Sequence, residues 1–268
     1  MDFSADASAE AVEAALAELA SVDRAAVSAR FFKSGPGQYG EGDRFIGVSV
    51  PATRSVVARF AGLPPVEVGK LLESPVHEHR LAALLVMVRQ FQVASRRRTR
   101  VDDAHDDDGR DDDDDGRDDD ARRALHEAYL VAVRAGRVNN WDLVDSSAEY
   151  LVGEFLRAAG RGDDPLLDEL AASDSLWERR VAVLATFAFI RAGDGGPILR
   201  LAPRLLGDRE DLMHKAVGWM LRELGKRVDR GVLRGFLDEY AARMPRTMLS
   251  YATEHLSPDE RAAYRAQR

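Results

Sequence analysis

The stretch LWERRVAVLATFAFIR, residues 176–191, carries apolar side chains at helical spacing, and two similar stretches lie on either side of it. They are NNWDLVDSSAEYLVGEFL, residues 139–156, and DLMHKAVGWMLRELGKR, residues 211–227. Apolar residues that recur every three or four positions indicate amphipathic helices, and short turns containing Gly, Pro or Asp separate them. The sequence therefore predicts antiparallel helical pairs, arranged either as a bundle or as a stacked solenoid.

An even spacing of three residues favours the solenoid. Trp141, Arg180 and Trp219 follow one another at intervals of 39 residues, and repeats of roughly 40 residues are typical of HEAT-type helical pairs. We expect the three side chains to project in register from one surface. The predicted fold is all-α: a single domain over residues 1–268, built as a HEAT-like superhelical solenoid whose concave face suits a long ligand such as a polypeptide or a duplex.

The acidic net charge of −8 is concentrated in one segment. Residues 102–120 hold thirteen Asp and two Arg, a net of −11, so the rest of the chain sums to +3. Like charges repel one another and this segment has little apolar surface, so we predict a disordered insert at about 98–121. Two interpretations stay open: a tolerated solvated insertion, or an acidic strand that mimics DNA and competes for the basic face.

Composition excludes several kinds of chemistry. The chain has no cysteine, so it forms no disulfide and has no thiolate nucleophile or sulfur-based metal site. No run of about 18 apolar residues occurs and the first residues lack the pattern of a signal peptide, so neither membrane insertion nor export is predicted. We expect a cytoplasmic protein.

Two short patterns resemble functional motifs but are explained by structural roles. GPGQYG, residues 35–40, matches GxGxxG, but no strand precedes it and no helix follows, so we predict a connecting loop and no dinucleotide site. His77 and His79 point to different sides of a helix and no further ligand cluster follows them. We expect solvated or capping roles for these histidines, and no metal and no cofactor.

The segment NNWDLVD, residues 139–145, combines an aromatic ring with a carboxylate. Asn139 or Asn140 can cap the following helix, and Asp142 suits its positively polarised first turn. Trp141 and Asp145 stand four positions apart on one helix face. On spacing alone, a core tryptophan beside a surface aspartate explains this pair, but the repeat spacing adds a guanidinium and a second indole. Such a set can hold a nucleoside and its phosphate.

Several motifs in order resemble the AlkD-type DNA alkylation repair family. They are FFKSGPGQYGEGDRFIGVSVPATRS (31–55), NNWDLVDSSA (139–148), LWERRVAVL (176–184), HKAVGWMLRELGKR (214–227) and MPRTMLSYA (244–252). The likeness spans nearly the whole chain except the acidic insert. It implies a HEAT-like fold and the release of N3- and N7-alkylated purines from duplex DNA.

The resemblance also implies roles for individual residues. The family's catalytic aspartate corresponds to Asp145, its groove-lining tryptophans to Trp141 and Trp219, and its DNA-gripping arginine to Arg180. Phe31 is a departure, because it occupies a place that can carry tyrosine. Further candidates for phosphate contacts are Lys215, Arg222, Lys226, Arg227 and Arg246.

The expected activity is therefore that of a monofunctional DNA glycosylase. A purine alkylated at N3 or N7 is cationic and a good leaving group, so one carboxylate suffices and no general acid is needed. The resemblance suggests that the base is not flipped into a pocket. We expect a monomer that acts on alkylated duplex DNA and associates with the nucleoid when bound. The alternative is a non-catalytic HEAT-like scaffold that binds DNA or protein.

Overall fold

The computed structural model describes residues 7–102 and 112–267, and the side chains within them except those of 97–102 and 112–117. The chain divides into two compact units, residues 1–147 and 148–268. The expected single domain stays a prediction.

Unit 1 is built from helices. They are α1 (Ala9–Ala17), α2 (Val22–Phe31), α3 (Val50–Arg59), α4 (Pro65–Glu73), α5 (His77–Asp102), α6 (Asp112–Arg134) and α7 (Trp141–Ala148). Across the described part of both units, extended pairing is limited to one isolated bridge between Arg44 and Val76. The all-α prediction is confirmed. No helix within the described ranges has the length and apolar character to cross a bilayer.

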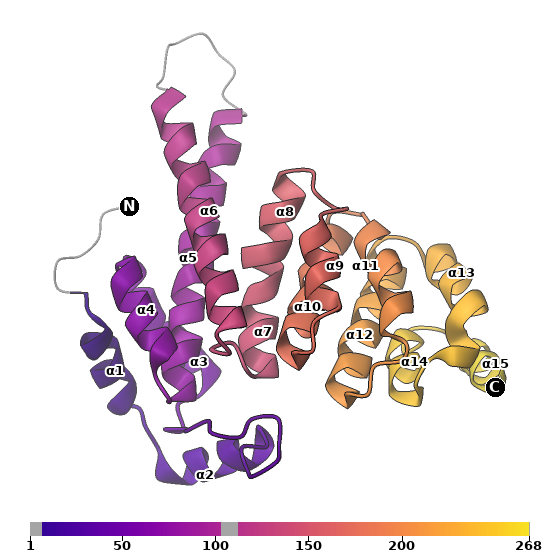
Figure 1. Cartoon of the computed structure of the whole chain (residues 1–268), viewed down its shortest axis with the longest axis horizontal. Coiled ribbons are helices and arrows are strands. Elements are labelled where there is room, and N and C mark those ends of the chain that lie inside the picture. Colours follow the sequence, from indigo (N-terminus) through magenta and orange to yellow (C-terminus); the bar gives the residue numbers. More distant parts are fainter. Residues whose placement is uncertain (1–6, 103–111, 268) are drawn as a thin grey trace. The chain divides into compact units, whose positions relative to one another are not determined.

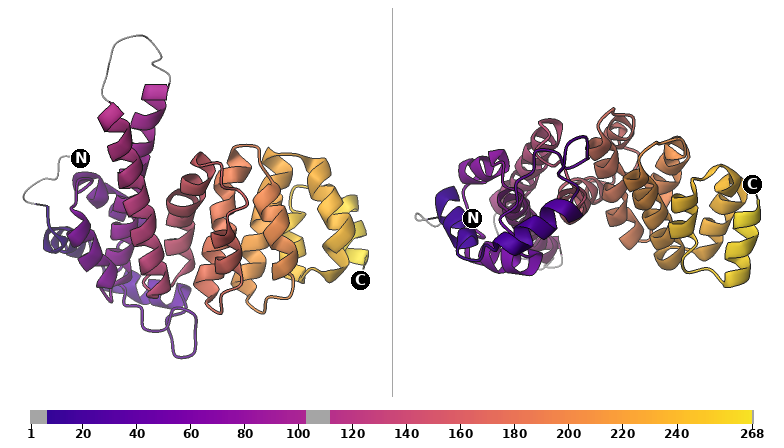
Figure 2. Two further views of the ribbon diagram at one scale, coloured as in Figure 1. Left: turned by 45° about the horizontal axis from the view of Figure 1, so that its top comes forward. Right: turned by 90° about the horizontal axis from the view of Figure 1, so that it is seen from below.

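The two longest helices of unit 1 extend into the acidic segment. α5 and α6 lie side by side as an antiparallel pair that projects beyond the neighbouring helices of this unit (Figures 1 and 2). Our prediction of a disordered insert over about 98–121 is therefore wrong at both ends, because α5 continues to Asp102 and α6 begins at Asp112. Extending a helix costs less than nucleating one, so a packed helix continues into sequence that would not fold alone. Residues 103–111 lie outside the described residues.

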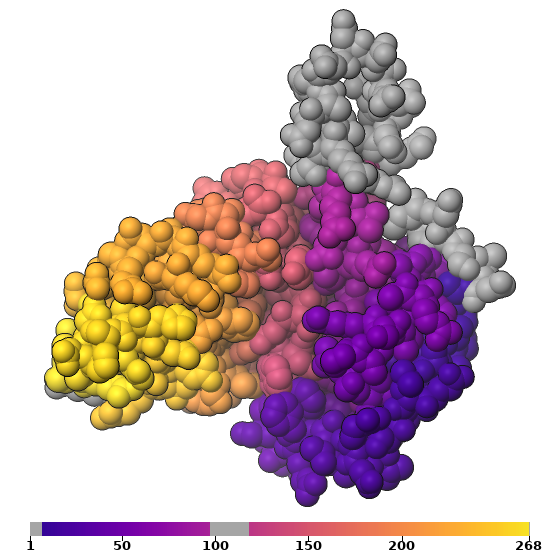
Figure 3. Space-filling model, turned by 180° about the vertical axis from the view of Figure 1, so that it is seen from behind, coloured from indigo at the N-terminus to yellow at the C-terminus, as the bar shows by residue number. Residues whose placement is uncertain are grey.

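Unit 2 consists of stacked helical pairs. Its elements are η1 (Glu149–Glu154), α8 (Phe155–Ala158), α9 (Pro165–Ala171), α10 (Leu176–Arg191), α11 (Gly196–Leu201), η2 (Ala202–Leu205), α12 (Asp211–Arg227), α13 (Arg230–Tyr240), η3 (Ala241–Arg243), α14 (Arg246–Ala252) and α15 (Pro258–Ala266). α10 packs against α12, and α12 packs against α14. The helices follow one another in chain order and end in α15, which is yellow in Figure 3. This succession is that of a helical-repeat solenoid.

The repeat length differs from the spacing that predicted it. The helices α7, α10, α12 and α14 begin at residues 141, 176, 211 and 246, a regular interval of 35 residues. The interval of 39 between Trp141, Arg180 and Trp219 is one helical turn longer. The three residues are accordingly the first, fifth and ninth of their helices, so the expected common register is wrong in its detail.

Side-chain caps fix where several of these helices begin. Ser8, Ser21 and Ser49 each accept a hydrogen bond from a backbone N–H in the first turn of α1, α2 and α3. Ser175 and Asp229 cap α10 and α13 in the same way. Each cap satisfies a donor that the helix leaves without a partner, so the helix starts are encoded locally.

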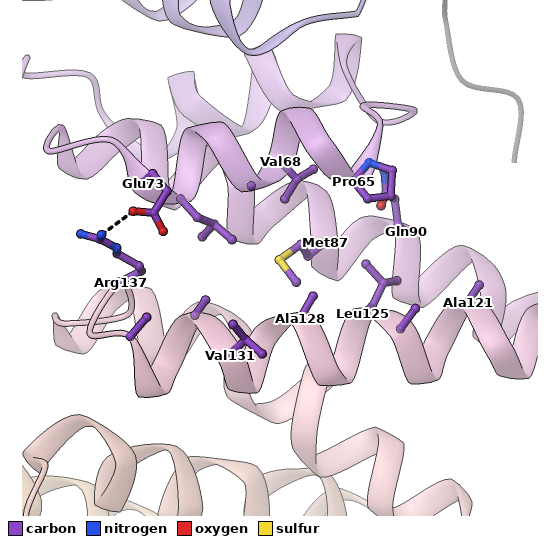
Figure 4. Close-up of a pocket in the computed structure, with 15 residues that line it drawn as sticks. Pro65, Val68, Glu73, Met87, Gln90, Ala121, Leu125, Ala128, Val131 and Arg137 are labelled. Atoms are coloured by element: carbon purple, nitrogen blue, oxygen red, sulfur yellow. Dashed lines mark ion pairs between the residues drawn. The ribbon is translucent and has the colours of Figure 1, made fainter.

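An apolar hollow of about 390 Å³ lies between α4 and α6 of unit 1, with α5 forming its floor (Figure 4). Small side chains of α6, including Ala121 and Ala128, face Pro65 and Val68 across it. An ion pair between Glu73 and Arg137 lies at one end. The hollow exists because alanines on α6 do not fill the space that α4 leaves.

Two glycines of unit 2 provide a matched test of its helix packing. A Cβ added at Gly218 would lie 2.5 Å from the backbone oxygen of Met248 in α14, whereas one added at Gly235 would meet nothing within 4 Å. We expect Gly218→Ala to lower the free energy of unfolding by roughly 1–3 kcal/mol, because α12 and α14 must separate. Gly235→Ala should raise it by roughly 0.5–1 kcal/mol, because alanine has the higher helix propensity. Urea unfolding measures both, and a stabilising Gly218→Ala would contradict the close packing.

Candidate functional site

The start of α7 carries the two candidate residues of unit 1. The side chain of Asn140 accepts a hydrogen bond from the backbone N–H of Trp141 at 2.9 Å, so Asn140 is the capping residue. Trp141 opens the helix and Asp145 follows one turn later on the same face. Both side chains are half-buried. The indole and the carboxylate are thus held by one short, capped helix.

Asp43 ties a long loop to this helix start. Its buried carboxylate accepts hydrogen bonds from the side-chain amides of Asn139 and Asn140 at 3.1 and 3.2 Å. It also accepts from His77 and from Arg80 of α5. Burial alone would raise the pKa of Asp43, but the hydrogen bonds of His77 and Arg80 and the charge of Arg80 lower it to about 2. Asp43 is therefore ionised, and its carboxylate accepts hydrogen bonds from four side chains.

His77 bridges two carboxylates in the interior. Its Nδ1 lies 3.1 Å from Asp43 and its Nε2 lies 2.8 Å from Asp142 of α7. Burial opposes the charged imidazolium, yet these two hydrogen bonds raise the pKa of His77 to about 9. With 2% of its surface exposed, His77 is not the solvated or capping residue that we predicted, because both ring nitrogens are occupied internally. His79 does point elsewhere, toward Ser74 and Glu13.

Glu78 holds the loop that carries Asp43. Its buried carboxylate accepts hydrogen bonds from the backbone N–H groups of Ile46, Gly47 and Val48. The GPGQYG segment earlier in this loop consists of turns, so its assignment as a connecting loop is confirmed. Gly40 is required there by space, since a Cβ at this position would lie 2.4 Å from the backbone oxygen of Phe32.

Aromatic rings surround the imidazolium. Phe32 stacks on Trp141 with ring centroids 5.3 Å apart, and Phe45 stacks on His77 at 4.7 Å. Phe31 meets the Trp141 ring edge-on at 5.9 Å and is 63% exposed. Aromatic faces attract cations and exclude water, so the cluster both stabilises protonated His77 and fixes the plane of the indole.

The buried hydroxyl groups of Ser147 and Tyr129 form a hydrogen bond in unit 1. Ser147 contacts the phenolic oxygen of Tyr129 at 3.0 Å, and its hydroxyl also lies 2.6 Å from the backbone oxygen of Leu143. Burial raises the pKa of Tyr129, and the negative charge of Asp145 raises it further. Tyr129 therefore stays a neutral phenol.

Arg180 of unit 2 lies in the interior. It is 4% exposed, and its guanidinium donates a 2.6 Å hydrogen bond to the backbone oxygen of Leu212 at the start of α12. We expected this side chain to project from an open surface, and the structure instead places it between α10 and α12. The physical reason is its position on the second turn of α10, the helix that packs against α12.

Trp219 is half-buried beside a residue that sequence reasoning did not identify. The centroid of its ring lies 6.1 Å from that of Phe187 on α10. The guanidinium of Arg227 lies over the Phe187 ring, 5.3 Å from its centroid. Phe187 is seven residues beyond Arg180, or about 10 Å along the helix. Within unit 2, Trp219 is thus level with Phe187 rather than with Arg180.

The remaining candidates lie along α12 and at the start of α14. Lys215 forms a 2.8 Å ion pair with Asp211, and Arg222 pairs with Glu223 and Glu254. Arg246 is exposed beside a hollow that it lines together with Arg265. Lys215, Arg222 and Arg246 are therefore at least partly accessible to an anion.

Distance along the chain explains why Asp43, His77 and Arg80 were missed. They lie 60 or more residues before α7, and no local pattern links them to it. The one available signal was the group of polar residues Asn139, Asn140 and Asp142, which is unusual at a buried helix start. Among the described residues, no group of three or more His, Asp or Glu side chains is arranged to hold a metal ion, and the predicted lack of a metal stays a prediction.

Comparison with known proteins identifies a family and a similar fold. The model of a family described as DNA alkylation repair enzyme matches residues 12–256. A solved structure titled as a predicted DNA alkylation repair enzyme from Enterococcus faecalis superposes with a TM-score of 0.62. That similarity covers 89% of this chain and 97% of the other at 12% identity, so it concerns the fold. No curated protein matches the chain.

The bridge at His77 predicts a particular pH dependence of stability. The pKa is about 9 in the folded protein and 6.5 for an ordinary histidine. The stabilisation is therefore complete below about pH 6.5 and is lost as the pH rises toward 9. We expect the free energy of unfolding to fall by on the order of 2–3 kcal/mol over this window, and His77→Gln should abolish the fall.

Urea unfolding at half-unit pH steps measures this effect. His255→Gln, which removes an exposed histidine of unit 2, serves as the control and should keep the fall. Parallel pH profiles for the wild type and His77→Gln would contradict a charged bridge.

Proposed function

Because the chain belongs to the DNA alkylation repair enzyme family, we propose that it is a DNA glycosylase that excises cationic N3- and N7-alkylated purines from duplex DNA. The single observation that carries the proposal is the pairing of Asp145 with Trp141 on the capped α7 helix. A fixed, half-buried carboxylate beside an indole is a suitable environment for a developing sugar cation.

The chemistry requires little of the protein. Alkylation gives the purine a positive charge, so the base departs as a neutral molecule when the N-glycosidic bond breaks. Positive charge then develops on the deoxyribose as an oxocarbenium-like ion. The Asp145 carboxylate stabilises this charge and orients the water that attacks the sugar carbon. No base needs to enter a pocket, so the duplex is read without base flipping.

The other residues bind and position the duplex. The indole of Trp141 contacts a sugar and excludes water, which strengthens the electrostatic effect of the Asp145 carboxylate on the same helix. The indole of Trp219 in unit 2 supplies a further sugar contact. Lys215, Arg222 and Arg246 supply backbone phosphate contacts, which position the duplex without reading its sequence. Arg180 adds positive charge while its hydrogen bond to Leu212 holds the first turn of α12. Binding should therefore weaken with salt.

Replacement of Asp145 tests the mechanism. Asp145→Asn keeps the shape of the side chain but removes its charge, so we expect the single-turnover rate of N7-methylguanine release to fall at least about 100-fold. Duplex affinity should change little, because phosphate contacts dominate it. The assay uses a duplex with one N7-methylguanine and detects the free base.

Glu127→Gln is the matched control, since it removes an exposed carboxylate of the same unit. It should release base at the wild-type rate. Full activity in Asp145→Asn would remove this carboxylate from the mechanism. A wild-type protein that binds the duplex and releases no base would instead favour the non-catalytic scaffold.

A further inference from the structure

A cleft of about 350 Å³ opens at the end of unit 2, between the end of α12, the start of α13 and the end of α14. Its floor is apolar and buried, formed by Leu233, Ala252 and Leu256. Its rim is basic: the lining residues include Arg222, Lys226, Arg230 and His255. The helices come close enough to form this cleft because of Gly225, where a Cβ would lie 2.4 Å from the Leu233 side chain.

The charges around the cleft do not cancel. Two nearby carboxylates, those of Glu223 and Glu254, form ion pairs with Arg222, and Glu223 also pairs with Arg227. A third carboxylate, that of Asp229, accepts a hydrogen bond from the backbone N–H of Val232 and caps α13. These ion pairs hold the pKa values of Glu223 and Glu254 below the ordinary value, against the effect of burial at Glu223. Lys226 and Arg230 are exposed and have no ion pair within the described part of the chain. Lys226 and Arg230 carry two positive charges against the one negative charge of Asp229, so the surroundings of the cleft keep a net positive charge.

The cleft continues a row of residues along α12. Lys215, Trp219, Arg222 and Lys226 are spaced by four, three and four residues, so they lie on one face of this helix. The row is about 16 Å long at 1.5 Å per residue. It alternates cations with an aromatic plane, an arrangement suited to a nucleic-acid strand, whose phosphates need cations and whose sugars and bases contact rings.

We propose that this cleft binds a phosphate group, and that the group is a backbone phosphodiester of duplex DNA. Lys226 and Arg230 are the principal ligands, and His255 lies at the rim. The inference rests on the proposed function for its choice of DNA as the partner, and it adds a phosphate site that lies beyond Trp219 toward the end of α12. Neither Arg230 nor His255 belongs to the candidate set derived from the sequence.

The double variant Lys226→Ala/Arg230→Ala tests the site by fluorescence anisotropy with an undamaged duplex over a series of salt concentrations. We expect roughly tenfold weaker binding, and a slope of log affinity against log salt that is smaller by about one to two. The control Arg161→Ala/Arg204→Ala removes the same charge from cations of unit 2 that do not line the cleft. It should leave the slope unchanged, and thermal unfolding confirms that both variants fold.

Three results would overturn the site. The first is a double variant whose affinity and salt slope equal those of the control. The second is a pair of observations: inorganic phosphate shifts the proton resonance of His255, and the double variant binds the duplex as tightly as the wild type. That pair would indicate a site for free phosphate. The third is an acidic peptide of equal charge that binds more tightly than the duplex.

Base release separates this inference from the proposed function. If the wild type releases no base, the glycosylase proposal fails. The anisotropy with undamaged DNA still decides whether the cleft binds the duplex.

Discussion

A protonated imidazole held between two buried carboxylates is the interaction on which the candidate site depends. His77 joins Asp43, at the end of a glycine-rich loop, to Asp142, in the first turn of α7. An ion pair in the interior is costly unless every charge has partners, and here Arg80 and two asparagine amides supply them. The network therefore stabilises one position of the loop and of the helix start. Trp141 and Asp145 are held in place with the helix start because they belong to α7.

Unit 2 achieves its arrangement by repetition rather than by a buried polar network. Helices that begin 35 residues apart stack in order, and glycine permits their close approach at Gly218. Because α12 packs on both α10 and α14, one face is left to present Trp219 among basic residues. The same stacking ends in a cleft where Lys226 and Arg230 form no ion pair with any of the described residues. A protein with a net charge of −8 thus keeps a locally basic surface.

Sequence reasoning identified the helices because apolar periodicity and capping residues are local signals. It also placed Trp141 and Asp145 on one face, since a separation of four residues has that consequence in any helix. It failed for His77, whose two partners lie 34 and 65 residues away, because such contacts follow from packing and leave no periodic pattern. It failed similarly for Phe187 and for the burial of Arg180, which depend on how α10 lies against α12. Equal spacing of 39 residues suggested a shared register, whereas the helices themselves repeat every 35.

Native-state hydrogen exchange tests whether the polar network holds α7 in place. Asn140→Ala removes both the cap on Trp141 and the hydrogen bond to Asp43, while Ser49→Ala removes only the cap of α3 in the same unit. The account predicts that amides of Leu143 to Ser147 exchange about tenfold faster or more in Asn140→Ala and at the wild-type rate in Ser49→Ala. Unchanged protection of α7 in Asn140→Ala, or equal acceleration throughout unit 1, would contradict it.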